Sequence, residues 1–169
     1  MESRDLLLTA CDNVETVVRS ALDGIDPALL TARIDPEANT IGWLVWHLTR
    51  VQDDHVAEVA GTEQAYTAGG WADRFALPFS PRAIGYGFSS EDVGKTDIRD
   101  PHLLIDYHAD VHRRTAEFLR TLSSADLDRI VDERWDPPVT LGVRLVSVIG
   151  DDLQHAGQAA LLRGFLERR

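Results

Sequence analysis

Apolar residues recur every three or four positions in four separate stretches of this chain. That spacing places them along one side of an α-helix, so each stretch is predicted to form an amphipathic helix. The expected helices cover about residues 3–22, 40–61, 101–122 and 140–166. Ser3 and Asn39 are expected to cap the first two. Four helices that must each bury one side are typical of a four-helix bundle, so the sequence predicts an all-α fold.

The connection between the second and third helices, about residues 61–96, is longer than a bundle requires. It contains glycines in the segments GG and GYG, and its aromatic residues include Trp71, Phe75, Phe79, Tyr86 and Phe88. We expect it to hold short helices, to pack over the bundle and to cross one end of it. One short extended piece is expected in RIVDERW, residues 129–135. No repeat or linker is evident, so residues 1–169 are expected to form a single domain.

The charge of the chain narrows the class of partner. Seventeen basic residues stand against 28 acidic ones, for a net charge of −11, which disfavours nucleic acid as a partner. The one cysteine, Cys11, excludes an intrachain disulfide and is expected to lie in the core. No segment has the ~18 apolar residues of a membrane helix, and the N-terminus is too acidic for a signal peptide. We therefore expect a cytoplasmic protein with no membrane partner.

Polar residues interrupt the apolar side of the last helix at its middle. Asp152 and His155 occupy the gap, and Asp151 lies at its flank. Asp151 and His155 are four positions apart, so both side chains can reach one atom from one side of the helix. Burial of such groups costs several kcal/mol unless something offsets it. Either they pair with each other and with polar neighbours, or they bind a cation.

The second helix offers a third group. His47 lies at the edge of its apolar side, between Trp43 and Val51, and Asp54 falls on nearly the same side. Metal sites in bundles are built from inward side chains of facing helices. Two imidazoles and one carboxylate suit Zn²⁺ with an open fourth position, or Ni²⁺ or Fe²⁺ with more open positions. A buried histidine bonded to an aspartate, without any metal, also fits this spacing.

The other histidines offer a rival site. His108 and His112 are again four positions apart, at the border of the third helix's apolar side and among charged residues. We expect this pair to belong to a solvated face. His55 lies among charges and His102 in the first turn of a helix, so both are expected at the surface.

Several segments resemble the DinB-like superfamily of metal-binding four-helix bundles across essentially the whole chain. They are TIGWLVWHLTRVQDDHVAEVAG, GGWADRF, GYGFSSEDV and WDPPVTLGVRLVSVIGDDLQHAGQAALLRGF. The resemblance is closest to the branch of mycothiol-dependent transferases and maleylpyruvate isomerases. Members use a histidine on the second helix and H-x-x-x-H, or a carboxylate in place of its first histidine, on the fourth. The resemblance thus implies His47, Asp151 and His155 as ligands, and it favours Asp151 over Asp152.

The same resemblance implies a function. It points to a detoxification enzyme, namely a metal-dependent S-transferase. Such an enzyme joins a low-molecular-weight thiol, here mycothiol, to an electrophile. The metal converts the thiol to its thiolate before the transfer. Zinc is the first expectation for the metal, with nickel or iron as alternatives. The isomerases carry a second domain and this chain ends at Arg169, after the last helix, so a stand-alone transferase is expected. A hydrolase that activates water at the metal, and a binding protein without catalysis, remain the alternative functions.

Three further residues are candidates for substrate binding. Trp43 and Tyr86, with Trp71, are expected to form an apolar wall, and Arg144, two turns before Asp151, is expected to hold a carboxylate or to form a surface ion pair. The expected partners are therefore the small-molecule thiol and the electrophile, with the chain as a monomer or homodimer.

Overall fold

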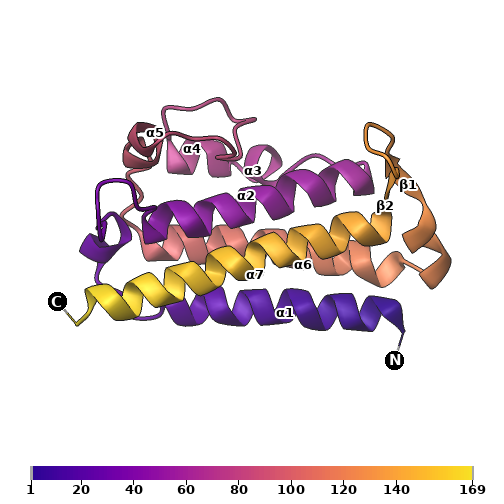
Figure 1. Ribbon diagram of the computed structural model, residues 1–169, viewed down its shortest axis with the longest axis horizontal. Coiled ribbons are helices and arrows are strands. Elements are labelled where there is room, and N and C mark those ends of the chain that lie inside the picture. Colours follow the sequence, from indigo (N-terminus) through magenta and orange to yellow (C-terminus); the bar gives the residue numbers. More distant parts are fainter. Residues whose placement is uncertain (1, 169) are drawn as a thin grey trace.

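The computed structural model describes residues 2–168, and four long helices dominate it (Figure 1). These helices are α1 (Ser3–Leu22), α2 (Ile41–Ala60), α6 (Pro101–Thr121) and α7 (Leu141–Leu166). They lie side by side along the long axis of the molecule, and α2 and α1 each pack against both α6 and α7. The predicted all-α bundle is confirmed. No helix among the described residues is long and apolar enough to cross a membrane.

The starts of the helices follow from side-chain caps. The Thr40 hydroxyl accepts a hydrogen bond from the Trp43 amide at 3.1 Å, and the Thr140 hydroxyl accepts one from the Val143 amide at 3.3 Å. These bonds satisfy amides that have no partner within the first turn of a helix. The expected caps Ser3 and Asn39 are each wrong by one position, since Glu2 and Thr40 cap α1 and α2.

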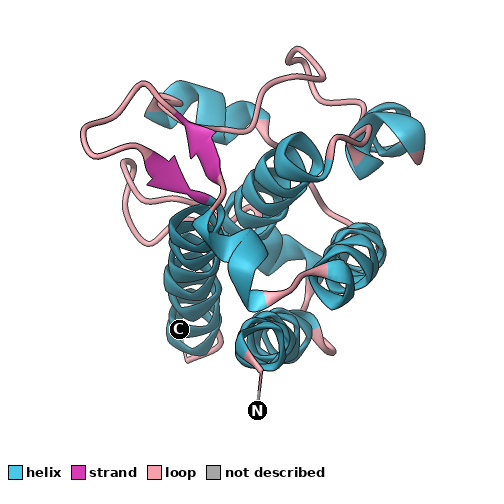
Figure 2. Ribbon diagram, turned by 90° about the vertical axis from the view of Figure 1, so that its right-hand side faces the viewer, coloured by secondary structure: helices cyan, strands magenta, loops and turns pink. Residues whose placement is uncertain are grey.

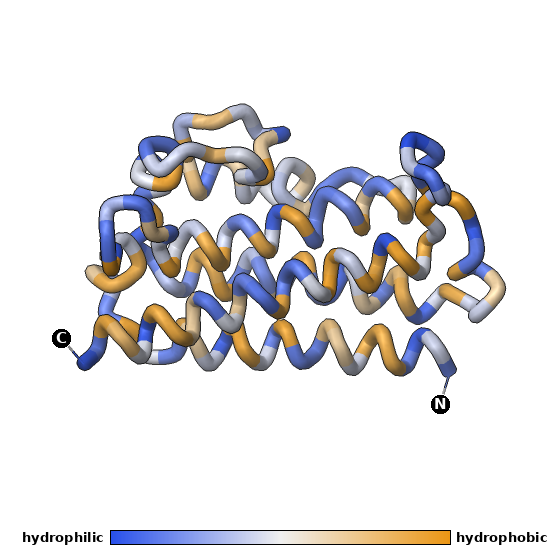
Figure 3. The backbone as a smooth tube through the Cα atoms, in the orientation of Figure 1, coloured by the Kyte–Doolittle hydropathy of each residue, from blue (hydrophilic) through white to orange (hydrophobic). Residues whose placement is uncertain are grey.

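The core lies between the four long helices, and α2 is its most buried member. From Ile41 to Asp53 every residue of α2 is buried, because α6, α7 and the connection after α2 cover different sides of it. Figure 3 shows how apolar segments alternate with polar ones along α1, α6 and α7, as expected for helices that keep one side in water. Cys11 is buried in the core, as predicted.

The connection between α2 and α6 holds three short helices and lies along the outer side of α2 (Figure 1). They are α3 (Ala65–Ala68), α4 (Trp71–Phe75) and α5 (Ser90–Lys95). Trp71 and Phe75 pack their rings against Tyr107 of α6, at 5.5 Å between centroids in both cases. Phe88 stacks on Trp46 of α2. The expectation of short helices packed over the bundle is confirmed, whereas the expected crossing of one end of the bundle is wrong, because the connection runs lengthwise beside α2.

A two-stranded antiparallel sheet precedes α7 (Figure 2). It is formed by β1 (Ile130–Asp132) and β2 (Val139–Thr140), so the extended piece expected in residues 129–135 is present. Two 3₁₀ turns, Pro27–Leu30 and Ser124–Asp128, complete the connections. Because Thr140 both ends β2 and caps α7, the small sheet fixes where the last helix begins.

Candidate metal centre

Three predicted ligands meet between α2 and α7. One ligand atom from each of His47, Asp151 and His155 lies within 4.8 Å of the others. The Nε2 atom of His155 is 3.6 Å from Oδ1 of Asp151, and the two imidazole centroids are 5.0 Å apart. Asp151 and His155 share one side of α7 because they are four residues apart, and His47 faces them from α2. The structure therefore brings together the three side chains that the sequence singled out.

Hydrogen bonds orient both imidazoles. The Nδ1–H group of His47 donates to the carbonyl oxygen of Ile84, and the Nδ1–H group of His155 donates to Oε1 of Gln158 at 3.0 Å. In each ring the lone pair is then on Nε2, the nitrogen that remains for a metal. A partner on the second nitrogen is the usual way in which proteins orient a ligating histidine.

Burial also favours the neutral, ligating form of His47. Loss of water around the ring lowers the pKa of His47, and the neighbouring His155 lowers it further, although the bond to Ile84 and the charge of Asp151 act in the opposite direction. Oδ2 of Asp151 is buried and has no hydrogen-bond partner among the described residues. An unsatisfied buried carboxylate oxygen is costly unless something pairs with it. The two imidazoles and the carboxylate of Asp151 together are a donor set that fits a divalent cation.

A glycine lets the connection reach His47. Gly85 has φ +92°, and a Cβ atom there would lie 2.8 Å from Nδ1 of His47 and 3.1 Å from the ring of Trp46. Only glycine combines this backbone conformation with such a close approach. The His47 ring also stacks on Trp43, at 4.6 Å between centroids and 14° between planes. The imidazole is thus in contact with both an indole and a backbone segment.

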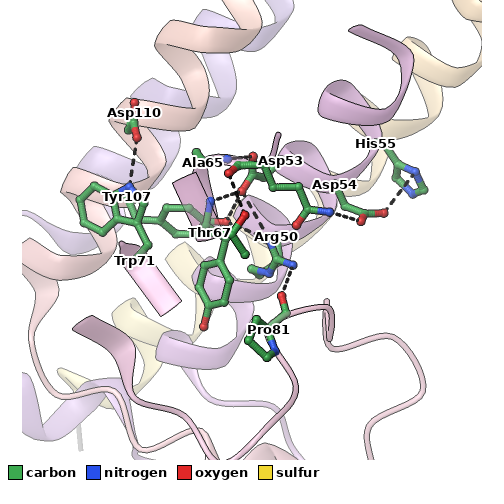
Figure 4. Close-up of polar contacts among 12 residues, drawn as sticks. Arg50, Asp53, Asp54, His55, Ala65, Thr67, Trp71, Pro81, Tyr107 and Asp110 are labelled. Atoms are coloured by element: carbon green, nitrogen blue, oxygen red, sulfur yellow. Dashed lines mark hydrogen bonds and ion pairs between the residues drawn. The ribbon is translucent and has the colours of Figure 1, made fainter. Parts of the chain in front are cut away.

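The buried guanidinium of Arg50 holds the same segment (Figure 4). Arg50 is fully buried, one turn after His47 on α2. It donates to the carbonyl oxygens of Pro81 at 3.0 Å and of Ala83 at 3.2 Å. Since Ala83 precedes Ile84, these bonds fix the chain next to the carbonyl that orients His47. Arg50 therefore helps to position His47, a candidate ligand, without being one of the three itself.

Asp53 compensates the charge of Arg50. Its Oδ2 atom lies 3.3 Å from the guanidinium and accepts a hydrogen bond from the Tyr107 hydroxyl at 2.9 Å. Its two oxygens also accept the amides of Ala65 and Tyr66, at 2.7 and 2.8 Å. Burial raises the pKa of Asp53, while these bonds and Arg50 lower it. Sequence reasoning missed this pair, although a charged i, i+3 pair inside a largely apolar helix was a visible signal.

A cavity of about 350 Å³ lies beside Arg144. It is lined by His55, Asp132, Arg134, Trp135, Val139, Val143, Arg144 and Ser147. Arg144 donates to Oδ2 of Asp132 at 3.0 Å and to Nδ1 of His55 at 2.9 Å. Burial, followed by the charge of Arg144, lowers the pKa of His55. Asp151 also acts on that pKa, so the cavity and the three ligands belong to one electrostatic neighbourhood.

The three aromatic residues expected to form an apolar wall for substrate lie in three different environments. Trp43 contacts the candidate centre directly, through both histidine rings. Tyr86 is 89% exposed, so its ring is turned to solvent next to Gly85. Trp71 donates to Asp110 of α6 and packs in the core, so its contacts are with α6.

The expectation of a solvated face around His108 is wrong. His108 is 1% exposed, and burial lowers its pKa to about 3. The contact that covers it is with α2, where Thr49 lies 3.1 Å from its Nδ1 atom. His112 is also largely covered and pairs with Asp12 and Glu15 of α1. The periodicity of α6 did not reveal that α1 and α2 both pack on it and widen its buried side.

Two further histidines and one aspartate lie outside the three candidate ligands. His55 was expected at the surface but is half-buried against Arg144, whereas His102 is exposed as predicted. Asp54 bonds to Gln64 and lies near His55, outside the three ligands.

Asp152 has a different environment from Asp151. It is 1% exposed, as its place in the apolar stripe predicted, and burial followed by the charge of Asp151 raises its pKa well above the usual value. Burial, with Asp152 as the next cause, raises the pKa of the Cys11 thiol to about 12. The Cys11 thiol therefore supplies no thiolate nucleophile near neutral pH.

The fold and these ligands define a helical bundle with a candidate metal centre between two of its helices. The chain belongs to the DinB superfamily, whose family model matches residues 10–159. Its structure is similar to the crystal structure of a conserved protein from Enterococcus faecalis, with a TM-score of 0.93 and 26% sequence identity. That similarity covers 100% of this chain and 99% of the other. No curated protein matches the sequence.

Proposed function

We propose that this protein is a metal-dependent S-transferase that joins a low-molecular-weight thiol to an electrophile. The observation that carries the proposal is the set of three ligands, one atom from each lying within 4.8 Å of the others. Three protein ligands leave at least one coordination position for a substrate, as in catalytic rather than structural zinc sites. A divalent metal bound by His47, Asp151 and His155 would supply the Lewis acidity that keeps a bound thiol deprotonated near neutral pH.

The thiol comes from outside the chain in this proposal. The only cysteine, Cys11, is buried, and its pKa of about 12 keeps it protonated. A nucleophile must be accessible and at least partly ionised, so Cys11 does not meet the requirement. The resemblance to mycothiol-dependent transferases makes mycothiol the first thiol to test.

The protein's own residues orient the reactants. Ile84 and Gln158 keep the Nε2 atoms of the two histidines turned to the centre. Arg144, at the cavity of about 350 Å³, would hold an anionic group of the thiol or the electrophile. Trp43 would provide an apolar surface, and Tyr86, exposed between two glycines with positive φ, would fold over the bound molecule.

A thiol panel tests the proposal. Metal-loaded protein is mixed with an aryl halide such as 1-chloro-2,4-dinitrobenzene and with mycothiol, glutathione or cysteine in turn. We expect loss of the electrophile to depend on the thiol and on the metal, and to fall to background in His155→Ala. The matched control, His102→Ala, changes an exposed histidine and should behave as the unaltered protein. Hydrolysis of an ester at a rate independent of thiol would instead favour the hydrolase, and metal binding without either reaction would favour a binding protein.

A further inference from the structure

One half of α7 carries no charge. The four charged residues of this helix are Arg144, Asp151, Asp152 and Arg163. At ~100° per residue they fall on the half that faces the bundle and the candidate metal centre. The opposite half contains only Gly, Ala, Val, Ile, Leu, Phe, Ser and Gln, in a chain that is 27% charged. Figure 1 shows α7 in front of α6, with its outer side away from the other long helices.

Large apolar side chains on this outer half are in water. Val143, Val146 and Leu161 are 57%, 62% and 71% exposed, and Leu153 is 39% exposed. Near the start of the helix they border an apolar groove of about 430 Å³ between α1 and α7. Its lining is Ser3, Leu6, Leu7, Ala10, Leu127, Gly142, Val146 and Ile149. Stripe and groove together form a continuous apolar surface, which we call the outer face of α7.

Glycines recur on the outer face every seven residues, at Gly150, Gly157 and Gly164. Glycine disfavours a helix relative to alanine, so an interior glycine needs a reason. Packing within the chain gives none for the first two, because a Cβ atom added at Gly150 or Gly157 meets nothing within 4 Å. A small residue every seven positions is what lets a second helix approach closely along a heptad seam.

We propose that the outer face of α7 binds a second copy of this chain, with the two α7 helices antiparallel about a two-fold axis. The spacing of the residues selects the position of the axis. An axis between Leu153 and Gln154 sets Gly150 opposite Gly157 of the partner subunit, at the closest approach. It also sets Val146 opposite Leu161 of the partner subunit, whose side chain would enter the groove between α1 and α7. The face is thus complementary to itself, as a two-fold interface requires.

The lack of charge on the outer face permits a second copy as the occupant. Each chain has a net charge of −11, so two copies repel wherever their charged surfaces meet, and the uncharged outer face is where they can approach. The 26 residues of α7 extend ~39 Å, and a stable interface buries ~800 Å² per partner, so the proposed contact must include the groove between α1 and α7 as well as the helix. His155 lies on the opposite side of α7, so the proposed dimer leaves the candidate metal centre open.

Oligomeric state is the first test. Sedimentation velocity on the full chain over a wide concentration range should give a dimer, and Val146→Glu or Leu161→Glu should give monomers. Trp135→Glu, at another exposed apolar residue, is the matched control and should remain dimeric. A monomeric unaltered chain overturns the proposal and leaves the face to a different partner. A dimer that persists in both charge variants places the interface elsewhere and also overturns it.

Crosslinking tests the position of the axis. Leu153→Cys should form an intermolecular disulfide under mild oxidation, because the two copies of this residue meet next to the axis, whereas Ser147→Cys should not. The buried Cys11 does not interfere. Gly157→Ala should raise the melting temperature of a monomeric Val146→Glu background, yet weaken dimerisation of the otherwise unaltered chain. Disulfide formation at Ser147→Cys but not Leu153→Cys, or unchanged dimerisation in Gly157→Ala, would contradict this geometry.

Discussion

The Nδ1–H group of His47 donates to the carbonyl oxygen of Ile84, a residue that follows it by 37 positions. The ring is thereby oriented by backbone from the connection between α2 and α6, and not by a carboxylate. Arg50 and Gly85 both serve this contact, one by binding the adjacent carbonyl and the other by leaving room for the ring. The candidate metal centre therefore depends on the connection as well as on the two helices that carry its ligands.

Replacement of either histidine should remove the metal. His47→Ala and His155→Ala each delete one direct bond, and two remaining protein ligands seldom retain a divalent ion. Elemental analysis of the purified variants should find little metal, while circular dichroism should find the helices intact. His102→Ala is the control. A variant at His47 or His155 that retains stoichiometric metal would refute the proposed ligand set.

Substitution of the two adjacent aspartates, Asp151 and Asp152, should affect metal binding to different extents. Asp151→Asn removes a charge that faces the histidines and should weaken divalent-metal binding strongly. Asp152 is buried outside the three candidate ligands, so Asp152→Asn keeps the shape of the side chain and should cost ~10–100-fold in affinity at most. Metal titration of both apo variants shows which of them has the weaker affinity. The opposite order would mean that the ligand carried over from the family is displaced by one residue.

Gly85→Ala should weaken metal binding without unfolding the protein. The added Cβ atom would lie 2.8 Å from Nδ1 of His47, so the connection must move and the imidazole loses its partner. We expect a loss of ~10–100-fold in metal affinity. Gly87→Ala is a close control, because Gly87 also has positive φ but an added Cβ atom there meets nothing within 4 Å. Equal losses in the two variants would show that backbone strain alone is responsible.

Arg50→Met should destabilise the fold. The substitution leaves Asp53 buried without its cation, and breaking a buried ion pair on one side costs about 3–5 kcal/mol. Urea unfolding should record this loss, whereas Arg74→Met, at an exposed site, should have little effect. The double variant Arg50→Met, Asp53→Asn should recover part of the stability. A double variant less stable than Arg50→Met would argue against charge pairing as the main contribution.

His108 should make the apo protein sensitive to acid. Its folded-state pKa is about 3 against an ordinary 6.5, so between these values the unfolded chain binds the extra proton. Stability is therefore lost as the pH falls from about 6.5 toward 3, by up to about 1.4 kcal/mol per pH unit. Urea unfolding of apo His108→Gln should show a shallower decline than the unaltered protein, and His102→Gln should not. Parallel declines in all three would remove His108 as the source.

The sequence predicted the bundle because its signals are local. Periodicity and cap residues located all four long helices to within one or two positions, and a four-residue spacing placed Asp151 beside His155. These features depend on neighbours within one or two turns, which a single sequence contains. The choice of Asp151 over Asp152 needed the family resemblance, since periodicity alone favoured the better-buried Asp152.

Features that depend on contacts between distant segments were not predictable. The connection beside α2 supplies the Ile84 carbonyl to His47, and nothing near either residue signals the pairing. The burial of His108 depends on two helices that pack on α6 at once. Arg144 pairs with Asp132 because a two-stranded sheet brings residue 132 next to α7. In each case the partner was set by tertiary packing, which residue types and spacing do not encode locally.

Thr140 makes α7 sensitive to length. It ends β2 and caps the helix, so every later residue has a fixed rotation relative to the bundle. Insertion or deletion of one residue between Thr140 and Asp151 would turn the rest of α7 by ~100°, which moves the ligands away from His47 and turns the uncharged side toward the core. In descendants of this chain, the span from Thr140 to His155 should therefore keep a constant number of residues.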